Sequence, residues 1–144
     1  MAYTVDVQYF KQPGGDIVVK ELAIISIDRD MDPIVLLFKP PFPWRRLTEK
    51  YKSENTWLQE KVHGLCWDNG ECDYSQLGYL IRVSLKDSKA VYVIGSTKKM
   101  FMKHFKINVI NVTDLDHLQN VKLIKKFVYA QKEWKDVSME WEYS

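Results

Sequence analysis

The amino-acid sequence predicts an α/β fold, in which a mixed five-stranded sheet is flanked by helices. Five segments have the length and apolar pattern of strands, and the first three follow one another directly, as in an antiparallel meander. The fourth and fifth each follow a segment with helical spacing of apolar residues. Strands joined through a helix lie parallel, because only a crossover returns the chain in the same direction. We expect one domain over residues 1–144, since this length suits a single core.

The three N-terminal strands are predicted from alternation and from turn residues. Residues 3–9 alternate between apolar and polar side chains, which is the pattern of a strand with one buried face. The Pro13-Gly14-Gly15-Asp16 turn connects this strand to a second one within residues 17–25. Residues 34–38 form the third strand, which ends before Pro40 because prolines remove backbone donors.

The rest of the chain is predicted to alternate helices with two short strands. The expected elements are one or two helices in residues 43–62, a loop at 64–70, a helix that follows the N-cap residue Asp73 with Leu77, Leu80, Ile81 and Leu85 as its stripe, a strand at 90–94, a helix from the cap Ser96 to Phe105, a strand at 108–112 and a lysine-rich helix at 116–129. On the helix that Ser96 caps, the residues expected on or beside the buried face are Met100, Phe101, His104 and Phe105.

Charge and composition limit the classes of function. The formal net charge of +2 is too small to indicate nucleic-acid binding, because binding depends on local fields. The charge is unevenly distributed, and the segment from Lys98 to Lys132 has Asp114 and Asp116 as its only acidic residues. The chain has no apolar run that could span a bilayer, no secretory signal pattern at its start and only two cysteines. These features predict an intracellular protein, cytoplasmic or nuclear, with no membrane association.

Short motifs along the chain resemble those of the ribonuclease-H-like 3′→5′ exonucleases with four acidic residues and a histidine (DEDDh). Val5-Asp6-Val7-Gln8 resembles the first exonuclease motif, which is Asp-x-Glu on strand one. Val62-His63-Gly64-Leu65 is similar to the His-Gly-Ile-Thr tetrapeptide of that family, and Val91-Tyr92-Val93-Ile94-Gly95-Ser96 to the strand and Gly-His-Asn of the second motif. The resemblance spans residues 4–127 and implies a ribonuclease-H-like fold.

The resemblance also implies two divalent metal ions held by carboxylates, and most of those carboxylates are missing. Asp6 matches the first acid, but Gln8 replaces the second, and its neutral amide adds no negative charge for a bridging ion. Where the next acid is expected the chain has Phe101, with Lys99 and Lys103 nearby. No His-x-x-x-x-Asp pair follows His117. We therefore assign no catalytic residue, treat Asp6 and Gln8 as vestigial, and expect no cofactor.

Two metal hypotheses stay open beside this interpretation. Glu21, Asp114 or Asp116 could rebuild a Mg²⁺ or Mn²⁺ site and make the chain an active exonuclease with relocated carboxylates. Separately, zinc could be held by His63, Cys66 and Cys72, which lie within ten residues, with a fourth ligand from Glu71, His104 or His117. For these last residues we favour the structural interpretation, in which Cys66 packs as a small apolar residue and Cys72 lies near a turn.

Basic and aromatic residues suggest binding without catalysis. The Phe42-Pro43-Trp44-Arg45-Arg46 segment could stack on bases and hold phosphates, or its aromatic side chains could close the core while its arginines are solvated. The candidate nucleic-acid-binding residues are Arg45, Arg46, Lys98, Lys99, Lys103, Lys122, Lys125 and Lys126. The lysines could also be the solvated faces of amphipathic helices.

The acidic C-terminal segment suggests a protein partner. Trp134 and Trp141, within residues 130–144, could either pack on the domain or anchor a partner. The sequence thus predicts a non-catalytic exonuclease-like module that binds nucleic acid, as RNA or single-stranded DNA, or a protein. The alternatives are the active metal-dependent exonuclease and a protein–protein adaptor with no nucleic-acid role.

Overall fold

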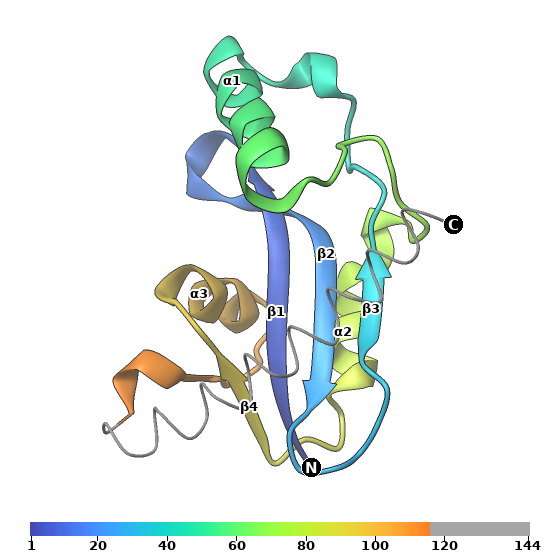
Figure 1. Ribbon diagram of the computed structural model, residues 1–144, viewed down its shortest axis with the longest axis vertical. Helices are drawn as coiled ribbons and strands as arrows, with labels where there is room; N and C mark the ends of the chain where they lie inside the picture. The colour runs from blue at the N-terminus through green and yellow to red at the C-terminus, as the bar shows by residue number, and fades with distance from the viewer. Residues whose placement is uncertain (116–144) are drawn as a thin grey trace. The chain divides into compact units, whose positions relative to one another are not determined.

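The computed structural model describes residues 1–115, so the predicted helix at 116–129 and the segment 130–144 lie outside the described residues. Within this part, the strands and α-helices occur in the predicted order (Figure 1). Their bounds are β1 Ala2–Lys11, β2 Ile17–Ser26, β3 Ile34–Leu37, α1 Glu49–Leu58, α2 Leu77–Ser84, β4 Ala90–Val93, α3 Ser96–His104 and β5 Ile110–Asn111.

The five strands form one mixed sheet in the order β3-β2-β1-β4-β5. Strand β1 pairs in parallel with β4, with Tyr3 beside Val91, and β4 pairs in parallel with β5, with Tyr92 beside Ile110. The arrows in Figure 1 show β2 running opposite to β1 and to β3. These directions confirm the α/β class and the prediction of a mixed five-stranded sheet.

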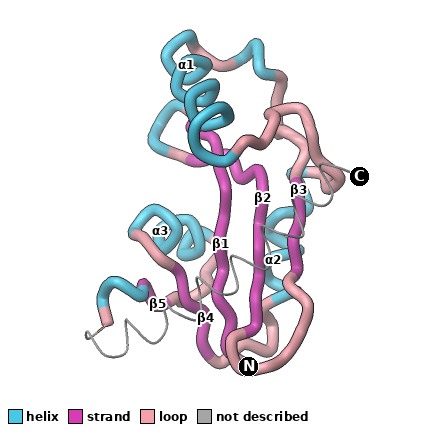
Figure 2. The backbone as a smooth tube through the Cα atoms, in the orientation of Figure 1, coloured by secondary structure: helices cyan, strands magenta, loops and turns pink. Residues whose placement is uncertain are grey.

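The β1–β2 connection is tight because two glycines adopt backbone angles that other residues avoid. Gly14 has a φ of 90° and Gly15 a φ of 84°, within a short 3-10 turn over Pro13–Gly15. The apolar runs at 17–19 and 22–25 form a single strand, and the polar pair between them is buried. The tube in Figure 2 shows the two strands joined by this turn.

The described residues form two compact units, and β1 and β2 contribute to both. The first unit comprises residues 1–6, 23–35 and 82–115, and its apolar contacts include Ala23 and Ile25 packed against Val35. The second comprises Val7–Leu22 and Leu36–Ile81. The core of the second unit is built from Phe10, Val18, Leu47, Leu58 and Trp67.

The segment predicted to hold one or two helices contains three helical pieces, all in the second unit. A 3-10 turn at Trp44–Arg46 precedes α1, and a π-helical turn at Gln59–His63 continues it. Gly64 then ends the helix in the left-handed conformation, with a φ of 68°. The buried Asn55 of α1 accepts from the backbone N–H of Lys11 at 2.8 Å and donates to its carbonyl at 2.8 Å, which fixes α1 to the end of β1.

Several predicted details of the later elements are wrong. Asp73 is the N-cap residue of a 3-10 turn at Tyr74–Gln76 that leads directly into α2, but its carboxylate makes no capping hydrogen bond and pairs with Lys39 at 3.7 Å. The N-cap of α3 is Gly95, with a φ of 110°, so Ser96 is the first helical residue. Strand β5 is shorter than predicted, because a 3-10 turn at Val112–Asp114 follows directly.

The buried face of α3 also differs from the predicted one. Met100 is 73% exposed and His104 is exposed, whereas Met102 is buried. Phe101 and Phe105 are half-buried, as expected for residues beside that face, and their rings contact edge-on at 5.1 Å. The helix is therefore rotated so that Lys98 and Met102, one turn apart, share its inner face.

Candidate functional site

The candidate site is a polar face in the middle of the sheet. Thr4 and Asp6 alternate with Val5 on β1 and so point to the same side of the strand, and each is only 1% exposed. Gln8, two residues further on, is half-buried. Among the described residues, the Thr4 hydroxyl has no hydrogen-bond partner. Buried polar groups destabilise a core unless they are paired, so their presence on a central strand marks this face as unusual.

A lysine from α3 covers the carboxylate of this face. The ammonium of Lys98 forms an ion pair and hydrogen bond with Asp6, whose side chain is 1% exposed, whereas that of Lys98 is 22% exposed. The helix reaches this position because it follows β4, the parallel neighbour of β1, and begins at Ser96, directly after the N-cap Gly95. The cation occupies the surroundings of the one acid that matches the exonuclease motif, and a divalent ion beside Asp6 would face like-charge repulsion.

The carboxyl ends of β4 and β5 carry a second polar group of residues. Asn111, 6% exposed, accepts hydrogen bonds from the backbone N–H of Gly95 at 3.1 Å and from the hydroxyl of Thr113 at 2.9 Å. Asp114 pairs with Lys99 at 3.5 Å, and both side chains are about half exposed or more, at 62% and 49%. Asn111 thus organises the turn before α3, and Asp114 faces a lysine.

The acidic residues that could rebuild a metal site do not form such a site in the described part of the chain. Glu21 is buried on β2, Asp114 is exposed beside Lys99, and Asp116 lies outside the described residues. Within residues 1–115, no three His, Cys, Asp or Glu side chains are close enough to hold a metal ion. The carboxylates of the described part therefore do not fit the two-metal arrangement that the exonuclease resemblance implies.

The zinc hypothesis meets a similar obstacle at His63, in the second unit. The ring Nε2 lies 3.2 Å from the carbonyl oxygen of Tyr9, and Nδ1 accepts the backbone N–H of Leu65 at 3.0 Å. Both ring nitrogens are thus used by the fold, and burial lowers the pKa of the imidazole. Cys66 is exposed and accepts from the Gln59 amide at 3.7 Å, so the prediction that it packs as a buried apolar residue is wrong.

Cys72 lies where the loop meets β3, near a turn as predicted. Its carbonyl accepts the N–H of Lys39 at 2.8 Å, and its N–H donates to the Leu37 carbonyl at 3.0 Å. The neighbouring Gly70 approaches so closely that a Cβ there would lie 2.4 Å from the Lys39 nitrogen. The backbone around Cys72 thus serves to dock the loop on the strand.

The aromatic residues after β3 pack in a core, whereas the basic residues that follow them are exposed. Phe42 and Trp44 pack against Trp67, each at 5.5 Å between ring centroids, and the Trp67 indole N–H donates to the Phe42 carbonyl at 3.3 Å. Arg45 and Arg46 are exposed on the 3-10 turn. The aromatic side chains therefore belong to the core of the second unit, whereas the two arginines are exposed.

Sequence reasoning missed a buried lysine on β2. Lys20 is 2% exposed, and its ammonium donates to the carbonyls of Phe38 and Trp67, both at 2.8 Å. Burial lowers the pKa of Lys20 to about 8, although nearby Asp68 and Cys66 oppose the shift. The available signal was a lysine within the apolar Val18 to Ile25 run, where a charge is expected only if the fold supplies partners.

Comparison with protein-family models, with curated proteins and with solved structures found no match for this chain. The helices within residues 1–115 are all too short or too polar to cross a membrane. The remaining predicted ligands, Lys122, Lys125 and Lys126, and the predicted anchors Trp134 and Trp141, lie outside the described residues.

Proposed function

We propose that the chain is a non-catalytic module of the ribonuclease-H-like exonuclease type that binds single-stranded nucleic acid. The observation that carries the first half of this proposal is the ion pair between Lys98 and Asp6. The strand order supports the ribonuclease-H-like layout, because the first strand is central, with a meander on one side and two parallel strands on the other.

Hydrolysis by two metal ions needs negative charge around Asp6, but this face of the sheet carries the positive charge of Lys98 instead. Two-metal catalysis requires carboxylates that hold both ions and so stabilise the attacking and leaving oxygens. Here Lys98 neutralises Asp6, Gln8 is uncharged, and Lys99 and Lys103 extend from the same helix as Lys98. A divalent ion would have to displace an ammonium from a carboxylate with little access to water. Recognition without cleavage is therefore the function that this geometry favours.

The proposal of nucleic-acid binding rests on charge distribution. Residues 86–106 contain six lysines and a single acid, Asp87. Lys99 and Lys103 lie four residues apart on one side of α3 and are exposed, and the ion pair of Lys99 with Asp114 is itself exposed, so a phosphate can replace the carboxylate. Lysines arranged in this way bind the phosphates of a strand without sequence preference, and affinity then falls with salt as counterions are released.

Binding to labelled single-stranded RNA and DNA tests both halves of the proposal. We expect retention that weakens as salt rises, with no shortening of the strand in Mg²⁺ or Mn²⁺. Replacing both Lys99 and Lys103 by Ala should reduce the slope of log affinity against log salt by about 1.4, which is the effect of two lost single-strand phosphate contacts. The matched control replaces Lys50 and Lys61, two exposed lysines of the second unit, and should keep the slope.

Three other outcomes would contradict the proposal. Strand shortening that Mn²⁺ supports and Asp6→Ala abolishes would establish the exonuclease with relocated carboxylates. The absence of retention at low salt would exclude nucleic-acid binding and leave the protein–protein adaptor. Equal loss of affinity in the Lys99/Lys103 and Lys50/Lys61 variants would show attraction by net charge alone.

A further inference from the structure

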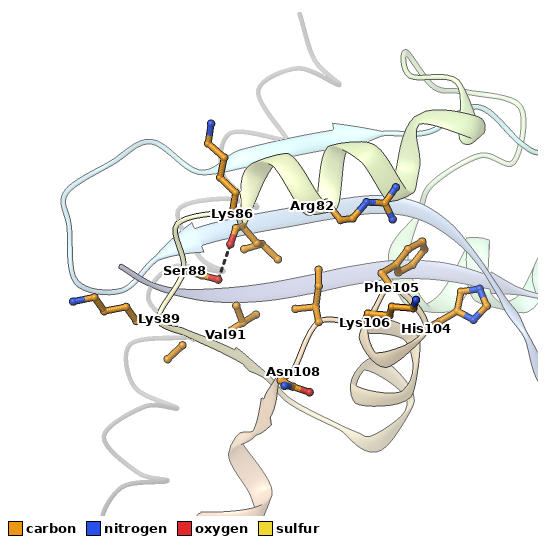
Figure 3. A pocket seen from close by; sticks show the side chains of 12 residues that line it. Arg82, Lys86, Ser88, Lys89, Val91, His104, Phe105, Lys106 and Asn108 are labelled. Atoms are coloured by element: carbon orange, nitrogen blue, oxygen red, sulfur yellow. Dashed lines mark hydrogen bonds between the residues drawn. The ribbon is translucent and has the colours of Figure 1, made fainter.

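A pocket of about 660 Å³ opens in the first unit (Figure 3). Its walls come from the last turn of α2, the start of β4 and the turn that follows α3. The volume is within the range of about 300–1,000 Å³ that small-molecule sites occupy. Neither Asp6 nor Lys98 lines it.

The pocket combines positive charge with an apolar wall. Five basic residues line it, and none of its described lining residues is acidic. Its apolar wall includes Leu85, Val91 and Ile107. The basic residues are Arg82, Lys86, Lys89, His104 and Lys106. A site of this composition favours a ligand with an anionic group at one end and a weakly polar body at the other.

The basic side chains are not spread evenly around the pocket. Figure 3 shows Arg82, His104 and Lys106 extending toward one side, around Phe105, whereas Lys89 extends away at the other end. The rings of His104 and Phe105 meet edge-on at 5.4 Å between centroids. A guanidinium, an imidazole and an ammonium thus line the same pocket as an aromatic ring, and guanidinium groups match the geometry of phosphate oxygens.

Lys106 holds its place in an unfavourable backbone conformation. Its φ is 61°, and it is the only residue other than glycine with a positive φ in the described part of the chain. It occupies the position after the α3 cap where glycine is usual, and the N–H groups of Lys106 and Ile107 close that turn on the carbonyls of Lys103 and Met102 at 2.9 and 3.3 Å. Glycine would adopt this backbone conformation at a lower energetic cost, so the requirements of folding do not explain the presence of a lysine at this position of the pocket.

We infer that this pocket binds the 5′-phosphate of a nucleotide, with Arg82 and Lys106 on the phosphate and the apolar wall and Phe105 against the base. The inference goes beyond the proposed function, because it assigns a discrete phosphate site to residues other than Lys99 and Lys103. A free mononucleotide and the 5′ end of a strand share this chemistry, and both are probes in the experiment.

Calorimetric titration of the full chain tests the inference with five probes: AMP, adenosine, inorganic phosphate, a tetranucleotide with a 5′-phosphate and the same tetranucleotide with a 5′-hydroxyl. We expect AMP to bind more tightly than adenosine or inorganic phosphate, because neither of these fills both parts of the pocket. The 5′-phosphorylated tetranucleotide should bind more tightly than its 5′-hydroxyl form if the site accepts strand ends. Affinity for AMP well above that for the phosphorylated tetranucleotide would identify the free nucleotide as the ligand.

Two variants test the assigned residues without relying on a destabilised protein. Arg82→Ala and Lys106→Gly should each weaken AMP binding roughly tenfold, which is the loss of one hydrogen bond to a charged group. Lys106→Gly relieves the positive φ, so its weaker binding cannot be attributed to poorer folding. The paired Lys50→Ala and Lys61→Ala control should bind AMP as the wild type does.

The inference is overturned if adenosine or phosphate alone binds as well as AMP, or if the Arg82 and Lys106 variants keep wild-type affinity. These failures are separable from a failure of strand binding, because the Lys99 and Lys103 double variant should retain AMP binding. Loss of AMP binding in that double variant as well would contradict a separate site.

Discussion

The ammonium of Lys98 contacts the carboxylate of Asp6, a residue 92 positions earlier in the chain. The carboxylate is almost inaccessible to water, while the lysine stem reaches it from the first turn of α3. Removing one member of a buried ion pair is destabilising, so this contact connects the proposed loss of catalysis with the stability of the fold.

Lys98→Ala should lower the free energy of unfolding by about 2 kcal/mol, somewhat less than for a fully buried pair because water reaches the lysine. Lys99→Ala is the matched control on the next residue, where the pair with Asp114 is exposed and the change should stay within about 1 kcal/mol. Urea unfolding of both variants measures the difference. Equal effects would mean that the Lys98 contact adds nothing beyond a surface pair.

Lys106→Gly should raise the free energy of unfolding by about 0.5–1 kcal/mol, because glycine adopts a positive φ without steric penalty but is more flexible when unfolded. The same substitution three residues earlier, Lys103→Gly, removes a good helix former inside α3 and should lower stability by about 1 kcal/mol. Thermal unfolding should therefore move in opposite directions for the two variants. A decrease in both would show that the Lys106 side chain itself stabilises the turn.

The secondary-structure elements and the direction of strand pairing could be predicted, because they depend on local sequence patterns. Alternation predicted β1, the turn after it and the apolar runs that follow predicted β2, and the strand–helix–strand order predicted the parallel pairing of β4 and β5. The start of α3 was misplaced by one residue, because Gly95 and Ser96 are both acceptable caps. These patterns are informative because the interactions that favour a helix or a strand join residues only a few positions apart in the sequence.

The site depended on contacts that no local pattern contains. Asp6 and Lys98, which form an ion pair, are 92 residues apart in the sequence. The charge of Lys98 alone predicts a nucleic-acid ligand, because the sequence does not reveal its contact with Asp6. His63 was considered as a metal ligand, yet its ring nitrogens are taken by the backbone of Tyr9 and Leu65. Residue type suggests chemistry, but its availability is decided by which neighbours the fold supplies.

Acidification should destabilise the second unit through His63. Burial, aided by the charge of Lys20, lowers the pKa of this imidazole below its usual 6.5, against the opposing effect of the Tyr9 carbonyl. The unfolded chain then binds the proton more readily, so the stability that this group contributes is present above pH 6.5 and is lost as the pH falls through the lowered pKa. Protonation would also place a hydrogen on Nδ1, which accepts from the Leu65 N–H.

The measurement compares the free energies of unfolding of the wild type and His63→Gln between pH 7.5 and 5. Glutamine can still donate to the Tyr9 carbonyl but does not titrate, so the advantage of the wild type should shrink as the pH falls. The other histidines are present in both proteins and cancel in the difference. A constant difference across this range would show that His63 is not perturbed by the fold.

The buried Lys20 should make the stability of the protein depend on pH in the alkaline range. Its pKa is about 8 in the folded protein against 10.5 for an ordinary lysine, because burial removes water from the charged ammonium. From pH 8 to 10.5 the unfolded chain binds more protons, so the contribution of this group to stability rises with pH, by about 3 kcal/mol in total. The neutral amine retains two hydrogens, which suffice for both carbonyls. The wild type should therefore gain stability relative to Lys20→Met between pH 7.5 and 10. If this difference stays flat, Lys20 keeps its charge in the folded state and the burial of its ammonium is relieved by water.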